Sequence, residues 1–309
     1  MTEKQNNKKV LIAYGMLIFV IFLWGVSPLI NAVLNDKCSV GLRSVLISGI
    51  SVITLLTICG KRLKNLNKEY FKWALPTGAC VAIASITQKI GLYYTTPTKY
   101  AFLENLSCVV VPIILFFAIK KRPSVLTIIS SVLCLIGAFV LGGMNFSAEN
   151  ITFGIGEVLC SLAGVLYGVN IAYTGNKIKK FDALIFLFVQ QCASAAIGAL
   201  SLVVFSNVKI NGAPIEVVNF VFDASIILLI LALALVSNVL CWFLRIYALK
   251  FVNPAAVAVM MPFSAVVTGV MSLIIGMDTL STEFVLGALI SLAAVILSSI
   301  ADIKYEKKE

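Results

Sequence analysis

The sequence predicts an all-α integral membrane protein with ten transmembrane helices, arranged as two inverted five-helix repeats. Three observations lead to this fold class: the apolar composition, ten apolar segments joined by short polar connections, and a similarity between the two halves of the chain. Of the 309 residues, 60% are hydrophobic and only 12% are charged. Soluble domains carry about 25% charged residues. This chain therefore has too little polar surface to cover a soluble globule.

The predicted helices follow from segment length. A helix needs about 20 apolar residues to cross roughly 30 Å of hydrocarbon. Ten segments meet this requirement and show no strict alternation of apolar and polar residues, which argues against membrane strands. They are residues 10–34, 38–60, 73–93, 97–119, 124–144, 154–175, 183–205, 224–249, 254–276 and 283–301.

The distribution of basic residues predicts the orientation. With the N-terminus in the cytoplasm, 18 of the 24 basic residues fall in inner connections and tails, and three fall in outer loops. The three outer residues are Lys37, Lys99 and Lys209. Lys and Arg accumulate on the cytoplasmic side of membrane proteins. We therefore expect a multi-pass protein of the plasma membrane with both termini in the cytoplasm, and we read the net charge of +10 as membrane anchoring, not nucleic-acid binding.

A weak internal repeat relates the two halves. The stretch "GLYYTTPTKYAFLENLSCVVV" aligns with "ALKFVNPAAVAVMMPFSAVVT" at an offset of 157 residues, without a gap through the next segment. The pairs "WG" in "FLWGV" and "YG" in "VLYGV" align at an offset of 143. Because each half has an odd number of helices, the second must enter the membrane from the opposite side, as in many secondary transporters. We expect one repeat at 1–144, another at 151–303, and a short charged cytoplasmic tail at 304–309.

Several motifs resemble those of the EamA family in the drug/metabolite transporter superfamily. They include "FLWGVSP", "KRPS", "LYG" and "NPAAVAVMMPFSAVV", and they extend over nearly the whole chain. The resemblance implies a ten-helix carrier that moves small metabolites, amino acids or drugs, often by export. One difference is "IIGMDTLS", where Asp278 stands in place of the Gly-Glu pair found in many relatives.

Polar and aromatic residues on the helix faces are candidates for a substrate pathway. In the first segment Trp24, Ser27 and Asn31 share one face by their spacing, and Tyr167 and Asn170 do so in the sixth. Such residues also serve as membrane-interface aromatics or as polar contacts between helices. The predicted pathway residues are Trp24, Ser27, Gln88, Glu104, Tyr167, Asn170, Gln190 and Asn238.

Charged residues within the segments suggest ion pairing or proton coupling. Glu104 needs a particular explanation, because a charge at the centre of a span costs roughly 2.5–3.5 kcal/mol of free energy. It can pair with Arg43 or Lys89, take up a proton, or contact a cationic substrate group, and Glu157 is a further acidic candidate. Arg245 lies near the inner end of its segment, so we expect its side chain to snorkel toward the cytoplasm.

The absence of several motifs narrows the function. There is no phosphate-binding loop, so ATP does not drive the protein directly, and there is no His and no metal-binding motif. We therefore predict no enzyme, no cofactor and no nucleic-acid partner. The leading hypothesis is a secondary transporter, by resemblance an exporter, of a small organic solute in the lipid bilayer. The alternative is a non-transporting membrane helper or lipid-handling scaffold. A homodimer is left open.

Overall fold

The computed structural model describes residues 3–35, 37–94, 103–120, 122–141, 154–207, 209–210, 213–214, 217–276 and 281–306. In the N-terminal half these residues form five α-helices and one 3₁₀ helix. They are α1 (Glu3–Asn35), α2 (Val40–Cys59), η1 (Gly60–Asn65), α3 (Lys68–Tyr94), α5 (Ser107–Phe117) and α6 (Val125–Leu141). The predicted beginning of the fourth segment, with Pro97 and Lys99, lies outside the described residues.

The C-terminal half is helical apart from one short hairpin. Its elements are α7 (Ile155–Lys177), η3 (Ile178–Lys180), α8 (Ala183–Asn207), β1 (Lys209–Ile210), β2 (Ala213–Pro214), α9 (Ala224–Ala232), η4 (Leu233–Cys241), α10 (Trp242–Ala248), α11 (Pro254–Met260), α12 (Phe263–Ile275) and α13 (Thr282–Glu306). The boundary between the predicted repeats, Asp278 and the last tail residues lie outside the described part.

Seven stretches of the described chain are helical, long and apolar enough to cross a membrane. Two shorter apolar helices, Ser107–Phe117 and Val125–Val140, accompany them. Large apolar side chains face outward, such as Phe117 with 73% of its surface exposed and Ile274 with 72%. An apolar exterior of this kind suits lipid contact, and the chain is a predominantly helical, multi-pass integral membrane protein.

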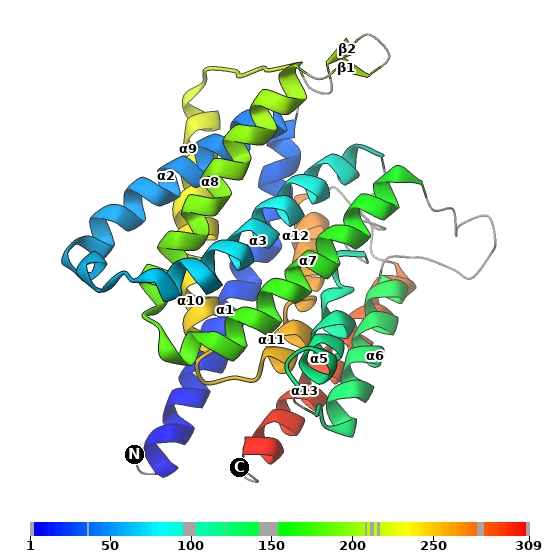
Figure 1. Cartoon of the computed structure of the whole chain (residues 1–309). Helices are drawn as coiled ribbons and strands as arrows, with labels where there is room; N and C mark the ends of the chain where they lie inside the picture. The colour runs from blue at the N-terminus through cyan, green and yellow to red at the C-terminus, as the bar shows by residue number, and fades with distance from the viewer. Residues whose placement is uncertain are drawn as a thin grey trace.

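The two termini lie at one end of the helix bundle, and the β1–β2 hairpin lies at the other (Figure 1). Basic residues make contacts at the end that holds the termini. The ammonium of Lys9 lies 5.9 Å from the ring of Phe251, and that of Lys250 donates a hydrogen bond to the carbonyl of Phe181 at 2.6 Å. At the hairpin end, Ser39 N donates to Asn219 O at 3.1 Å.

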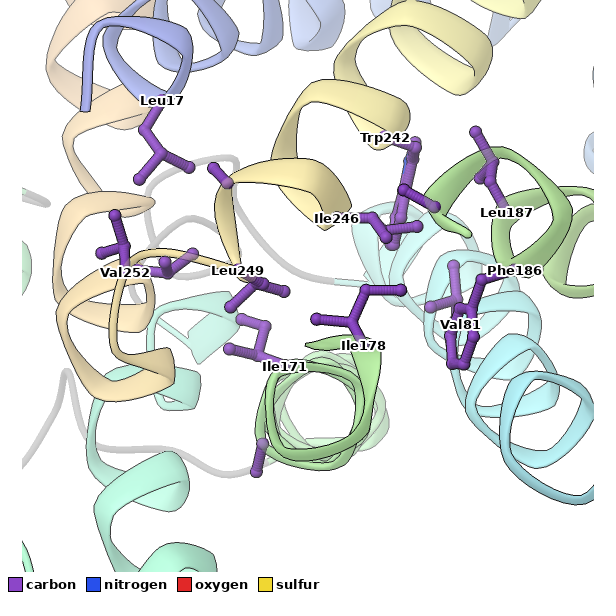
Figure 2. Close-up of a cluster of buried hydrophobic side chains, with 14 of the residues drawn as sticks. Leu17, Val81, Ile171, Ile178, Phe186, Leu187, Trp242, Ile246, Leu249 and Val252 are labelled. Carbon is purple, nitrogen blue, oxygen red and sulfur yellow. The ribbon is translucent and has the colours of Figure 1, made fainter. Parts of the chain in front are cut away.

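Apolar side chains from distant parts of the sequence form the core. Figure 2 shows side chains of α1, α3, α7, α8 and α10 converging, among them Leu17, Val81, Ile171, Phe186 and Ile246. Between membrane helices there is little water to expel, so dense packing and dispersion contribute most of the attraction. The core therefore fixes how the helices of the two halves meet.

Two glycines allow close contact between helices in corresponding ways. A Cβ atom on Gly25 of α1 would lie 2.6 Å from Val267 Cβ of α12. A Cβ atom on Gly168 of α7 would lie 2.7 Å from Val110 Cγ1 of α5. Both distances are shorter than real carbon atoms tolerate. Glycine is therefore required at both positions for the observed spacing of the helices.

The predicted single helix at 254–276 is interrupted, which corrects the sequence-based expectation. A turn at Met261 and Pro262 separates α11 from α12, because proline cannot donate a backbone hydrogen bond within the helix. A second turn, at Asn105 and Leu106, precedes α5. No proline occupies that turn, and nothing in its own residues explains it. The predicted helix at 224–249 is continuous but contains the π-helical segment η4.

Candidate functional site

Trp24, Trp242 and Arg245 form one cluster, the Arg245 cluster, between α1 and α10. The two indole rings meet edge to face with their centroids 5.5 Å apart. The guanidinium carbon of Arg245 lies 4.0 Å from the ring centroid of Trp242 and 5.6 Å from that of Trp24. Arg245 Nη2 also donates a hydrogen bond to Asn170 Oδ1 of α7 at 2.5 Å. The cluster therefore joins the first and second halves of the chain.

Arg245 does not snorkel, so the expectation from its place in the sequence was wrong. Only 2% of its surface is exposed. The side chain turns into the bundle, where two aromatic faces attract its charge and an amide oxygen accepts one of its hydrogen bonds. Those contacts come from α1, α7 and α10, which the position of Arg245 within its own helix does not reveal.

Ser85, Gln88, Glu104 and Tyr167 form a second cluster, the Gln88 cluster, where α3 meets α7 and the start of the interrupted fourth segment. The Tyr167 hydroxyl donates to Gln88 Oε1 at 2.8 Å and also contacts Ser85. The Glu104 carboxyl in turn lies close enough to the Gln88 side chain to interact with it. Four residues from three segments thus form a continuous polar chain that ends at a carboxyl group.

Buried hydrogen bonds connect α3, α7 and α8 beside these clusters. Asn170 Nδ2 donates to the backbone carbonyl of Thr77 at 3.0 Å. Gln190 Nε2 donates to Thr77 Oγ1 at 2.9 Å and to Thr174 Oγ1 at 3.3 Å. Tyr167 lies near enough to both Glu104 and Arg245 to interact electrostatically with each. Six of the eight predicted pathway residues therefore lie in the two clusters or in this adjoining network: Trp24, Gln88, Glu104, Tyr167, Asn170 and Gln190.

Several buried polar atoms have no hydrogen-bond partner within the described structure, and two of them belong to the groups just described. They are Arg245 Nε and Gln190 Oε1, and both side chains are only 2% exposed. A buried polar atom without a partner costs about 1–3 kcal/mol. Such atoms are rare in native proteins, and each needs an explanation such as water or a ligand.

The π-helical segment η4 supplies backbone acceptors to its neighbours. The Trp24 indole donates to Ser237 O at 3.3 Å, and Ser27 Oγ donates to Ser237 Oγ at 3.3 Å. Gln191 Nε2 donates to Asn238 O at 3.2 Å. Asn238 thus contributes its backbone here, whereas its side chain was the group predicted for the pathway.

The hydrogen bonds described for the other charged candidates go to groups outside the two clusters. Arg43 is 1% exposed and donates to Asn31 O at 3.0 Å and to Asn35 Oδ1 at 3.1 Å. Lys89 donates to Ser44 Oγ at 3.2 Å. Glu157 accepts a hydrogen bond from Gly154 N at 2.9 Å, so it caps the start of α7. Among the described residues, the contact recorded for the Glu104 carboxyl is Gln88, not one of these bases.

Sequence reasoning missed Trp242, Thr77 and the inward position of Arg245. The internal repeat of the sequence contained information that would have pointed to Trp242 and Arg245. At the offset of 157 residues, Ser85 aligns with Trp242 and Gln88 aligns with Arg245. Extending the alignment a few residues upstream of the quoted stretch would have placed both residues opposite pathway candidates.

Comparison with known proteins agrees with this description. Residues 154–300 match the model of the EamA-like transporter family. An uncharacterized transporter from Archaeoglobus fulgidus is 23% identical over 232 residues, which make up 74% of this chain and 70% of that protein.

The second half of the chain carries an EamA-like transporter family domain. The resemblance seen in its motifs is thereby confirmed, and this EamA protein is a membrane transporter, not an enzyme. A crystal structure of a protein with 14% sequence identity aligns with a TM-score of 0.75 over 95% of this chain and 98% of that one. At that identity the likeness shows the fold alone. Within the described residues, no group of His, Cys, Asp and Glu side chains could hold a metal ion.

Proposed function

We propose that this EamA protein is a secondary transporter of a small organic solute such as an amino acid, metabolite or drug. Ten spans in two inverted five-helix repeats would rock against each other and expose a central site to each side in turn. The central site would lie between the Arg245 cluster and the Gln88 cluster. Export is the direction that the family resemblance implies.

Paired contacts in the two halves support the inverted repeat. Gly25 and Gly168 are 143 residues apart, and the valines that they contact, Val267 and Val110, are 157 residues apart. These are the two offsets that relate the halves of the sequence. The helix interruptions also correspond. Cys108 N donates to Asn105 O at 3.0 Å. At the positions 157 residues later, Ala265 N donates to Pro262 O, also at 3.0 Å.

The observation that carries the proposal is that the same offsets relate the two polar clusters. Trp24 corresponds to Tyr167, Trp242 to Ser85, and Arg245 to Gln88. Trp24 contacts Trp242 and Arg245, just as Tyr167 contacts Ser85 and Gln88. Two matching clusters on either side of a pseudo-two-fold axis are the arrangement in which transporters bind substrate at the interface between repeats.

Glu104 is the proposed coupling residue. Its recorded contact is a neutral amide, so the described structure offers no basic partner that would hold the carboxylate ionised. A partly buried carboxyl group without a countercharge is tolerated by binding a proton. Proton uptake or release at Glu104 would change its interaction with Gln88, and the hydrogen bond from Tyr167 to Gln88 would transmit that change to the site. The ion pairing with Arg43 or Lys89 expected from the sequence becomes the less supported role.

Orientation follows from the clustered basic residues. Lys9, Arg62, Lys177 and Lys250 take part in contacts at the end that holds the termini, including a 3.6 Å ion pair of Arg62 with Asp182. We propose that this end faces the cytoplasm and that the protein resides in the plasma membrane. Reporters fused within 206–223 should be external, and reporters within 176–182 internal. A reversed pattern would overturn the orientation.

Solute flux tests the function itself. Purified protein in liposomes should take up at least one radiolabelled solute from a panel of amino acids, nucleosides and small cationic drugs, driven by an imposed pH gradient. Empty liposomes and liposomes with the Trp24→Ala, Tyr167→Ala double variant serve as controls. Specific solute or lipid binding without any flux would instead support a helper or lipid-handling scaffold.

A further inference from the structure

The guanidinium of Arg245 is a buried positive charge whose contacts among the described residues are all uncharged. It touches the faces of Trp24 and Trp242 and the amide oxygen of Asn170. Burying an ion costs several kcal/mol unless an opposite charge compensates for it. Cation–π contacts offset only part of that cost. Part of the cost is therefore uncompensated in this state of the protein.

No acidic side chain in the described structure contacts this guanidinium. The nearby acidic residue is Glu104, which interacts with Gln88 and with Tyr167. Tyr167 itself directs its hydroxyl hydrogen to Gln88. Arg245 Nε has no acceptor at all among the described residues. The charge and the unused N–H group point to the same missing partner, which is an oxyanion.

We propose that Arg245 binds an anionic, carboxylate-type group of the transported solute. This inference rests on the function proposed above and specifies its substrate class. The guanidinium presents a planar fork of donors, of which Nη2 serves Asn170 while Nε is unused. A carboxylate matches that planar geometry, and Lys could not reproduce it. The indole faces of Trp24 and Trp242 border the same group and suit an apolar or planar remainder of the solute.

The residue that corresponds to Arg245 in the other repeat is neutral, so only the Arg245 cluster would favour an anionic group. Gln88 stands where Arg245 stands, and it offers a neutral amide. The solute would therefore present its anionic group to the Arg245 cluster and a neutral or basic group to the Gln88 cluster. Gln190 Oε1, an acceptor without a described partner, is available to an N–H or O–H of the solute.

Tryptophan fluorescence can test anion binding without knowledge of the natural solute. The chain has three Trp residues, so the Trp73→Phe variant leaves only Trp24 and Trp242, which both contact Arg245. The purified variant would be titrated with acetate, benzoate and indole-3-acetate, and with the matching neutral amides. We expect a saturable fluorescence change with at least one anion and a response at least about tenfold weaker to its amide.

Variants separate a binding role from a structural one. Arg245→Gln in the same background should abolish the anion response, and Arg245→Lys should retain a weaker one. Arg43→Gln is the matched control, because it removes another buried Arg, one that donates to Asn31 and Asn35 of α1. It should leave the response unchanged. If no anion gives a saturable change, or if Arg245→Gln responds like the parent, the proposal is wrong.

Flux measurements distinguish failure of this inference from failure of the transporter function. The liposomes could take up a carboxylate and its matching amide at equal rates, and Arg245→Gln could leave both rates unchanged. That result would overturn the anion site while supporting transport. Anion binding that depends on Arg245, without flux of any tested solute, would support the site and count against transport.

Discussion

The Arg245 cluster and the Gln88 cluster use one scaffold for different chemistry. Each places an aromatic residue next to the glycine that allows close helix contact, Trp24 before Gly25 and Tyr167 before Gly168. In the Arg245 cluster the neighbours are a second indole and a guanidinium. In the Gln88 cluster they are a hydroxyl, an amide and a carboxyl group.

The comparison suggests a division of labour within the proposed repeat. Backbone spacing is shared, because it depends on glycine contacts and helix interruptions common to both halves. Charge is not shared: one cluster carries a fixed positive charge, whereas the other ends in a group that can gain or lose a proton. A fixed charge suits recognition of a solute, and a titratable group suits coupling to a proton gradient.

The largest expected effect on uptake comes from removing the titratable carboxyl group of Glu104. Glu104→Gln keeps the shape and hydrogen-bonding ability of the side chain but cannot ionise. If Glu104 couples transport to protons, the variant should lose pH-gradient-driven uptake into liposomes while retaining solute exchange. Unchanged gradient-driven uptake would remove Glu104 from the coupling mechanism.

Glu157→Gln is the matched control for that experiment. Glu157 caps the N-terminus of α7 through Gly154 N, so its replacement should leave coupling intact. Loss of a cap lowers stability by about 0.5–2 kcal/mol. Loss of coupling in Glu157→Gln would transfer the coupling role to that residue.

An intermediate effect is expected at the paired aromatics. Trp24→Ala and Tyr167→Ala should each reduce uptake strongly while the folded yield, measured by size-exclusion chromatography, stays near that of the parent. The milder Tyr167→Phe removes only the hydroxyl that donates to Gln88. It should reduce uptake about three- to tenfold, the value of one hydrogen bond. Loss of folded protein in both alanine variants would show that the aromatics are core residues and not part of the site.

The smallest expected effect concerns the shared scaffold and should be equal in the two halves. Gly25→Ala and Gly168→Ala each place a carbon within 2.7 Å of a valine, so each should lower the free energy of unfolding by about 1–3 kcal/mol. Gly15→Ala meets nothing within 4 Å and should be neutral or slightly stabilising. Thermal unfolding of the three purified variants gives the comparison. A large effect at only one of the two glycines would contradict the proposed symmetry.

The helices were largely predictable because each depends on local sequence. Long apolar runs bounded by basic residues predicted α1, α2, α7, α8 and α13 close to their observed positions. The interruption at Pro262 could be anticipated from proline, since it removes a backbone donor. The one at Asn105 could not, because its own residues give no such signal. The π segment η4 was likewise not predicted, since its carbonyls are bonded by side chains from α1 and α8.

By itself the sequence determined the membrane location, the helix segments, the family and most members of the candidate site. Those properties follow from composition, from the period of the helix and from motifs that adjoin one another in the chain. Only the tertiary structure decided that Arg245 points inward, that Trp242 joins Trp24, and that Glu104 contacts Gln88. The physical reason is that the free energy of a buried charge depends on its surroundings, and helices distant in the sequence supply them.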